Sequence, residues 1–362
     1  MGPSPERRVV ILSEGAFGED ASKTARGILR YGSDPVVAVI DSTRAGMTVD
    51  QVMGPGPRYD GVPIVADLSA ALVLPRRPTV LVLGLAPAGG KLPEAWRTQV
   101  AQALSEGIDV AAGLHTFLGD DPEFAAAAGR SGARIHDYRR PPERMDVASG
   151  RPHLPGKHVI LTVGTDCGVG KMGVAIELAM AAREAGLTAC MVPTGQTGMM
   201  IEGWGATVDR VAGDFIQGTV EWLTEEGERR ADWVFVEGQG SLDHVAYSSV
   251  TLGLIHGARP QGMVLVHQPG REVHFAFEGA GEFARLRSLD EMIAAHESIA
   301  ALVAPSKIVA IGLNTSRYPE DEARRIIAET SRATGLPADD PYRFGGGPLF
   351  EAIRARMESL GL

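Results

Sequence analysis

The feature that most constrains the fold is the run VILTVGTDCGVGKM, in which an apolar stretch leads directly into a glycine-rich turn. A helical pattern then starts near Lys171. Gly168 and Gly170 permit positive φ and a close approach of the backbone, so that successive N–H groups can point at one anion. The helix adds the positive end of its dipole, and Lys171 adds a point charge. These features predict a phosphate-binding loop formed by Gly164, Thr165, Asp166, Cys167, Gly168, Val169, Gly170, Lys171 and Met172.

The loop departs from the standard G-x4-G-K-[ST] pattern in two ways. Gly164 precedes Gly170 by one residue more than the standard spacing, and Met172 stands where a Ser or Thr hydroxyl normally binds Mg²⁺. A thioether is a poor ligand for a hard cation. We therefore expect the loop to hold a polyphosphate, while the need for Mg²⁺ stays open.

Short apolar runs alternate with helical stretches along the whole chain, which indicates parallel sheets covered by helices. In the first half we predict strands at 9–12, 36–40, 79–83 and 108–111, with helices at 21–31 and 93–106. In the second half we predict strands at 158–163, 188–192, 233–236, 263–267 and 308–313, with helices at 171–185, 213–224, 288–302, 321–334 and 348–360. The expected fold is α/β, with a Rossmann-like domain followed by a P-loop NTPase-like, doubly wound parallel sheet.

The composition changes over residues 137–157, which contain four prolines and almost no apolar period. Such a segment is typical of a domain boundary. We predict an N-terminal domain over 1–145, a linker over 146–157 and the phosphate-binding domain over 158–362. A long ordered crossover is the alternative.

Charge and composition limit the classes of partner. The net charge of −10 argues against nucleic acid and anionic membranes, which basic surfaces bind. Two cysteines exclude a disulfide framework. The N-terminus MGPSPERRVV has no long apolar region of the kind found in signal peptides, and no apolar window in the sequence is long enough to span a membrane. The turn from Ser13 to Gly18 contains only G-x-x-G, so we do not expect NAD. We expect a cytoplasmic enzyme that forms a homo-oligomer and acts on a small molecule.

Polar residues follow several predicted strands, where open α/β sheets bind ligands. Thr194, Gln196 and Thr197 can orient a carboxylate or an amino group, or they form a polar turn. His267 is the best-placed general base, and Arg271 can bind a substrate carboxylate through two hydrogen bonds.

Three further residues are open to two interpretations. His115 follows a strand of the first half and either binds substrate or is structural. Asp214 either contacts substrate or caps a helix. Asp121, followed by Pro122, is interpreted as the start of a helix rather than as a catalytic carboxylate.

The motif GTDCGVGKM resembles the GTD-x-x-VGKT loop of dethiobiotin synthetase and its P-loop relatives. The resemblance implies that Glu237, in the turn EGQGS that ends at Ser241, helps to bind a metal ion. It also implies that Asn314, which follows the strand predicted at 308–313, binds adenine.

The combination of GLHTFLGDDPEFA, DYRRPP, GTDCGVGKM, PTGQTGMMI, DRVAGDFIQG, EGQGSL and LVHQPGR is similar to a bacterial and archaeal family long classed as a domain of unknown function. Some members are described as D-glutamate N-acetyltransferases. The resemblance implies transfer of an acetyl group from acetyl-CoA to the α-amino group of a D-amino acid, with Glu237 or His267 removing the ammonium proton. Backbone N–H groups near Thr194 or Ser241 would stabilise the oxyanion. An ATP-dependent carboxylate–amine ligase and a nucleotide-binding regulator remain alternatives.

Overall fold

The computed structural model describes residues 7–19, 22–85, 90–143, 145–277 and 279–362. The chain divides into two compact units. Unit 1 runs to Arg140 and also includes Met199–Thr207, whereas unit 2 contains Pro141–Gly198 and Val208–Leu362. Among the described residues, each unit is built on one six-stranded sheet in which all paired strands are parallel. The α/β fold expected from the alternating pattern is confirmed.

Unit 1 has the strand order β3-β2-β1-β4-β5-β6, which is the order of a Rossmann sheet. Its strands are β1 (Val9–Leu12), β2 (Val36–Ile40), β3 (Ile64–Val65), β4 (Val80–Leu83), β5 (Asp109–Ala112) and β6 (Ile135–Asp137). Its helices are α1 (Lys23–Tyr31), α2 (Val49–Met53), α3 (Leu68–Leu72), α4 (Glu94–Ser105) and α5 (Pro122–Ser131).

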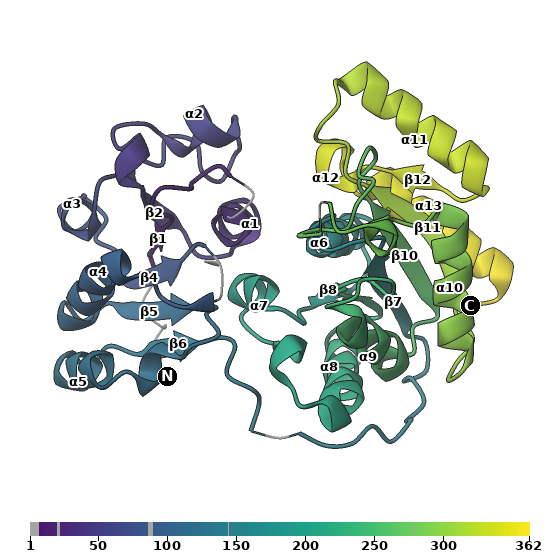
Figure 1. Ribbon diagram of the computed structural model, residues 1–362, viewed down its shortest axis with the longest axis horizontal. Coiled ribbons are helices and arrows are strands. Elements are labelled where there is room, and N and C mark those ends of the chain that lie inside the picture. Colours follow the sequence, from purple (N-terminus) through teal and green to yellow (C-terminus); the bar gives the residue numbers. More distant parts are fainter. Residues whose placement is uncertain (1–6, 20–21, 86–89, 144, 278) are drawn as a thin grey trace. The chain divides into compact units, whose positions relative to one another are not determined.

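Side chains alternate along the strands of unit 1, so each strand contributes to two apolar layers. Val10, Leu12 and Leu81 pack with Trp96, Phe124 and other residues of α3, α4 and α5 in one core cluster. Figure 1 shows these three helices together on one side of the sheet and α1 on the other. Asp121 accepts hydrogen bonds from the first turn of α5 and Pro122 is its first residue, so the predicted helix start is confirmed.

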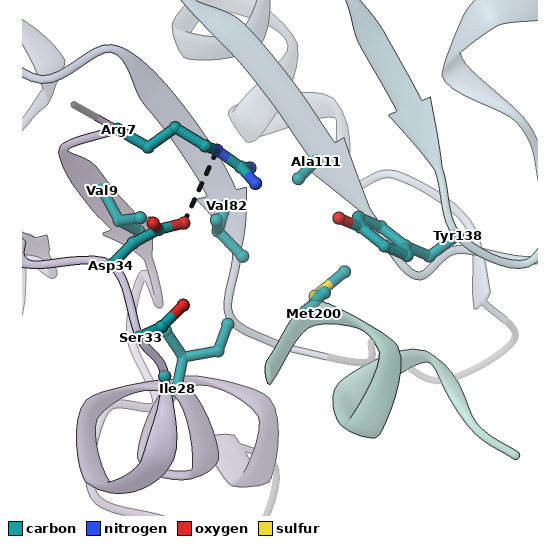
Figure 2. A pocket seen from close by; sticks show the side chains of 10 residues that line it. Arg7, Val9, Ile28, Ser33, Asp34, Val82, Ala111, Tyr138 and Met200 are labelled. Carbon is teal, nitrogen blue, oxygen red and sulfur yellow. Dashed lines mark ion pairs between the residues drawn. The ribbon is translucent and has the colours of Figure 1, made fainter. Parts of the chain in front are cut away.

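The other face of the unit 1 sheet has a small cavity of about 20 Å³ beside α1. Figure 2 shows Arg7 reaching Asp34, 3.5 Å away, with Tyr138 and Met200 on the opposite side of the hollow. A space of this size holds about one water molecule. It therefore offers no room for a substrate.

Unit 2 has the strand order β12-β11-β10-β7-β9-β8. Its strands are β7 (His158–Gly164), β8 (Ala189–Val192), β9 (Trp233–Val236), β10 (Gly262–His267), β11 (Lys307–Leu313) and β12 (Ala338–Asp339). The helices are α6 (Lys171–Glu184), α8 (Ile216–Arg230), α9 (Ser248–Ala258), α10 (Leu289–Ala301), α11 (Glu320–Thr334), α12 (Pro341–Phe344) and α13 (Gly347–Leu360). Helix α7 (Gln196–Glu202) begins in unit 2 and continues into the Met199–Thr207 segment of unit 1. The order places β7 between β9 and β10, where the chain changes direction across the sheet.

Helix α6 is buried around most of its circumference, because α12 and α13 cover the side that does not face the sheet. Two glycines allow this close packing. A Cβ on Gly173 would lie 3.3 Å from the Tyr342 ring, and one on Gly346 would lie 2.4 Å from the carbonyl oxygen of Glu177. The buried residues of α6 therefore extend around the helix rather than along one face.

The segment 146–157, predicted as a linker, contains no helix or strand and is bound along α8. Glu221 accepts hydrogen bonds from the backbone N–H groups of Ser149 and Arg151 at 2.8 and 2.9 Å. His153 Nδ1 lies 2.5 Å from Glu228 Oε1. Within the described residues, none of the helices is long and apolar enough to cross a membrane.

Candidate active site

The turn between β7 and α6 has the backbone geometry of an anion-binding loop. Gly168 has a φ of +66° and Gly170 a φ of +115°, both in the region that favours glycine. Helix α6 begins at Lys171, and its first turn contains no acidic residue. The Lys171 side chain is buried, and its Nζ donates to the Asp166 carbonyl oxygen at 2.7 Å. The loop therefore joins a helix N-terminus, open backbone and a folded-back ammonium group, which together suit a phosphate.

The turns after β8 and β9 meet beside this loop. The Glu237 carboxylate is buried, and its Oε2 accepts the backbone N–H groups of Thr194 and Gly195 at 3.0 and 3.2 Å. A Cβ on Gly238 would lie 3.0 Å from Lys171 Cδ, so the EGQGS turn packs against the lysine stem. The structure thus brings Glu237, Thr194 and Lys171 to one edge of the sheet.

These residues provide an incomplete ligand set for Mg²⁺. Glu237 supplies a carboxylate that already accepts two N–H groups, and Met172 supplies a thioether, which hard Mg²⁺ does not favour. Glu237 is thus the residue that would hold a divalent cation beside a bound polyphosphate. The second ligand usual in such loops is missing from position 172.

His267 ends β10 next to the loop, and its Nδ1 lies 3.0 Å from the Thr165 hydroxyl. Burial, helped by the positive charge of Arg271, lowers the pKa of His267 to about 4. The ring is therefore neutral at pH 7 and is a weak proton acceptor. It remains well placed to orient the loop through Thr165.

Arg271 binds the loop itself. Its Nη1 donates to Asp166 Oδ2 and to the Cys167 carbonyl oxygen, both at 2.7 Å. Burial alone would raise the pKa of Asp166, but hydrogen bonds from Arg271, the Phe275 N–H and His274 outweigh it and hold that pKa below its ordinary value. Asp166 is consequently an ionised carboxylate at the centre of a buried network.

Asn314 follows β11 and lies beside the loop. Its backbone N–H donates to the His267 carbonyl oxygen at 2.9 Å, and its side-chain Nδ2 lies 4.0 Å from the position that a Cβ on Gly170 would take. This placement is compatible with the adenine contact that the resemblance implies.

Of the other predicted site residues, some are buried in unit 2 and the rest are exposed. Gln196, Thr197 and Ser241 are buried in unit 2, the first two in α7. Asp214 is exposed in a 3₁₀ turn (Gly213–Phe215), and no side-chain hydrogen bond caps that turn or α8. The capping interpretation of Asp214 is therefore wrong, because the chain enters α8 directly from this turn. His115 is exposed in unit 1.

Sequence reasoning did not single out His274 or Asp243. His274 is almost fully buried, with Nδ1 3.1 Å from Asp166 Oδ1 and Nε2 3.3 Å from Asp243 Oδ2. Asp243 in turn accepts the Ser241 hydroxyl at 2.6 Å. A chain of polar groups thus runs from the phosphate loop to the EGQGS turn.

His244 brings a third candidate ligand close to Asp166 and His274, with one polar atom of each residue within 4.8 Å of the others. Both ring nitrogens of His244 are already used, however. Nδ1 accepts the Ala246 N–H at 3.2 Å, and Nε2 lies 3.2 Å from the Phe275 carbonyl oxygen, to which it donates. Metal binding would break one of these bonds, so the cluster is better explained as a hydrogen-bonded network.

Comparison with known proteins identifies the family. Residues 42–141 match the model "Domain of unknown function (DUF1611_N) Rossmann-like domain", and residues 146–350 match "Domain of unknown function (DUF1611_C) P-loop domain". The chain belongs to the DUF1611 family. A crystal structure of a DUF1611 family protein from Anabaena variabilis is 37% identical, with a TM-score of 0.88 over 96% of this chain and 99% of that one.

Two curated relatives carry the name D-glutamate N-acetyltransferase. The relative from Tritonibacter scottomollicae is 40% identical over 276 residues, which cover 76% of this chain and 81% of the relative. The relative from a Pseudoalteromonas species is 33% identical over 270 residues, covering 73% and 78%. The resemblance seen in the motifs is confirmed, and the DUF1611 chain described here is an enzyme of the transferase class.

Proposed function

We propose that this protein transfers the acetyl group of acetyl-CoA to the α-amino group of a D-amino acid, with D-glutamate as the first candidate. The observation that carries the proposal is the 40% identity to a D-glutamate N-acetyltransferase over most of both chains. The polar network around Asp166 and the phosphate loop lie within the matched P-loop domain.

The phosphate loop is proposed as the site for the donor. Coenzyme A carries a pyrophosphate and a 3′-phosphate on one adenosine, so a helix N-terminus with Lys171 suits it. A hydroxyl at position 172 is not needed for such a ligand, because no Mg²⁺ has to bridge reacting phosphates. Asn314, beside Gly170, is proposed to contact the adenine ring.

The reaction joins two groups and releases a thiol. The amine nitrogen attacks the thioester carbonyl carbon, the C–N bond forms, and the C–S bond breaks as the tetrahedral intermediate collapses. Two protons leave nitrogen, one from the ammonium group before attack and one that ends on the departing thiolate. N–H groups of the turns near Thr194 and Ser241 are proposed to stabilise the oxyanion.

Neither Glu237 nor His267 is well suited to take the first proton. Glu237 Oε2 is held by two backbone N–H groups, and the low pKa of His267 makes it a weak base. We assign Glu237 and His267 to shaping the donor site, together with Gln196 and Thr197 nearby.

One observation favours a second function, ATP-dependent amide formation. Glu237 places a carboxylate beside the phosphate loop, as a Mg²⁺-binding site requires. A ligase of this kind would phosphorylate a carboxylate, release ADP and form an amide.

Product analysis separates these functions. Purified protein is incubated with D- or L-amino acids and either acetyl-CoA with EDTA or ATP with Mg²⁺, and the products are weighed by mass spectrometry. Acetylated D-glutamate that forms in the presence of EDTA supports the proposal, whereas ADP and a new amide without acetylation overturn it.

Substitution of the loop lysine tests the donor site. Lys171→Ala should raise the Kd for coenzyme A by about 10-fold or more, because a hydrogen bond to a charged group is worth roughly 1.5–3 kcal/mol. Lys307→Ala is the matched control, since Lys307 is exposed and pairs with Glu297 at the start of β11. Equal affinity of both variants for coenzyme A would remove the loop from the proposed mechanism.

A further inference from the structure

The loop that follows β10 folds back on itself and lines an open pocket, which includes His274, the neighbour of Asp166 in the phosphate loop. The backbone N–H of His274 donates to the Ala284 carbonyl oxygen at 2.7 Å, and the backbone N–H of Leu286 donates to the Glu272 carbonyl oxygen at 2.9 Å. This pairing sets Val273 opposite Arg285, and His274 and Arg285 both line a pocket of about 440 Å³. Pockets for small ligands have volumes of this order.

The lining of this pocket is strongly charged and of mixed sign. Arg285 and Arg287 are exposed, and each lies 3.6 Å or more from its nearest carboxylate partner. The charged and titratable groups that line the pocket are Asp243, His274, Glu282, Arg285, Arg287 and Glu291. Such a lining suits a zwitterion that carries extra carboxylate charge.

The contact with Asp166 decides which ring nitrogen of His274 carries a donated proton. Asp166 is ionised and already accepts hydrogen bonds from Arg271 and the Phe275 N–H, so it must also accept from His274 Nδ1. In the neutral form of the ring the proton is therefore on Nδ1, and Nε2 presents a lone pair.

This lone pair faces another acceptor. Nε2 of His274 lies 3.3 Å from Oδ2 of Asp243, and neither atom has a hydrogen-bond partner among the described residues. In the neutral ring two buried acceptors face each other, which is unfavourable. A proton on Nε2 relieves this contact, and an ammonium group that donates to both atoms relieves it as well.

We propose that this pocket is the acceptor site of the enzyme, and that His274 Nε2 takes the proton from the α-ammonium group of a dicarboxylic amino acid whose carboxylates pair with Arg285 and Arg287. The inference rests on the proposed acetyltransferase function and deepens it. His274 would be a catalytic residue, and Asp166 a positioning residue that holds the ring through Nδ1.

The proton transfer balances without a further reactant. The ammonium group loses one proton to Nε2, which produces an imidazolium between the carboxylates of Asp166 and Asp243. The neutral amine then attacks the thioester, and the second proton of the nitrogen passes to the thiolate as the C–S bond breaks. The imidazolium releases the first proton to water, so that the reaction yields the amide, the thiol and one free proton. The same arrangement of base and orienting carboxylate serves nucleophilic catalysis in other enzymes.

The groups around the ring hold it in place for this step. His274 faces Asp166 and Asp243 directly, has His244 in ring contact at 5.1 Å, and lies near Arg271 and Lys171 through Asp166. His274→Asn should lower kcat by about 100-fold or more, because the group that accepts the ammonium proton is lost.

Binding measurements separate the roles of the pocket residues. Calorimetry is performed with D-glutamate and with glutarate, which has both carboxylates but no ammonium group. Arg285→Gln and Arg287→Gln should each raise the Kd of both ligands by about 10-fold, because an ion-paired hydrogen bond is lost. His274→Asn should weaken D-glutamate and leave glutarate unchanged.

Matched variants test whether such effects belong to the pocket. His256→Asn replaces a half-buried histidine whose Nε2 lies 3.0 Å from the Ile299 carbonyl oxygen. Arg354→Gln replaces an exposed arginine that pairs with Glu351 on α13. Both should match the unsubstituted protein in ligand affinity and kcat.

The results distinguish failure of this inference from failure of the proposed function. If the protein acetylates D-glutamate and the His274 and arginine variants behave like their controls, the acceptor site lies elsewhere and the inference is overturned. If no acetylation occurs, the proposed function fails, and the calorimetry still decides whether the pocket binds an amino dicarboxylate. Unchanged D-glutamate affinity in the arginine variants would overturn the pocket in that case.

Discussion

Asp166 Oδ1 lies 3.1 Å from His274 Nδ1, and this hydrogen bond joins the phosphate loop to the loop that follows β10. The same carboxylate binds Arg271 and the Phe275 N–H through Oδ2. One buried side chain thus holds the proposed donor site and the proposed acceptor site together. Its removal should affect both folding and catalysis.

Asp166→Asn should lower the free energy of unfolding by about 3–5 kcal/mol, because it leaves the Arg271 charge without its buried partner. Urea denaturation followed by circular dichroism measures the change. Asp120→Asn is the control, since the exposed Asp120–Arg140 pair should contribute at most about 1 kcal/mol. An equal loss of unfolding free energy in the two variants would show that the buried network around Asp166 stabilises the fold no more than an exposed ion pair does.

The contact of His153 with α8 should make stability depend on pH. Burial lowers the pKa of His153, but the Glu228 carboxylate and the Arg259 carbonyl outweigh that effect and raise it above the ordinary value of 6.5. This stabilisation is fully present below pH 6.5 and is lost as the pH rises through the raised pKa of the folded state.

Urea midpoints at several pH values above and below 6.5 test this prediction. His153→Gln should lower stability on the acidic side and reduce the loss seen on raising the pH. His136→Gln, a partly exposed residue of unit 1, provides the comparison. A pH dependence that is the same in all three proteins would contradict the assigned role of His153.

Strands that lie in continuous apolar runs were mostly predicted from the sequence. The bounds of β1, β2 and β9 agree with the prediction, because each is a buried β-branched or aromatic segment with a clear end. The strands β3, β6 and β12 were missed because they have only two or three residues and no apolar run. Their positions at or near sheet edges depend on tertiary pairing.

The residues of the candidate site were likewise predictable only where the local sequence carries a signal. Lys171 and Glu237 are recognisable because each stands in a glycine-rich turn directly after a strand. His274 stands seven residues beyond the end of β10 with no motif around it. Only the backbone pairing with Ala284 and the buried Asp166 place it, and neither contact has a local sequence signal.

Met172→Thr should restore the missing hydroxyl ligand and make ATP binding depend on Mg²⁺. ATP affinity is expected to rise with added Mg²⁺, while coenzyme A affinity in EDTA stays within a factor of about two. Met180→Thr is the control, because that side chain is exposed on the same helix. Strong Mg²⁺ dependence in the unsubstituted protein would instead favour the ATP-dependent function.

Gly238→Ala should disturb the donor site through packing alone. The new Cβ would lie 1.7 Å from the Thr162 carbonyl oxygen and 3.0 Å from Lys171 Cδ, so the backbone of the EGQGS turn must move. Overpacking of this kind costs typically 1–3 kcal/mol, and the displaced lysine should weaken coenzyme A binding as well.

Gly213→Ala separates this effect from the general cost of replacing a glycine. A Cβ at Gly213 meets nothing within 4 Å, so stability and coenzyme A affinity should both remain close to those of the unsubstituted protein. Urea denaturation and calorimetry measure the two quantities. If Gly238→Ala weakens folding but leaves coenzyme A affinity intact, Lys171 does not depend on the EGQGS turn for its position, and Glu237 would then act on the donor independently of the lysine.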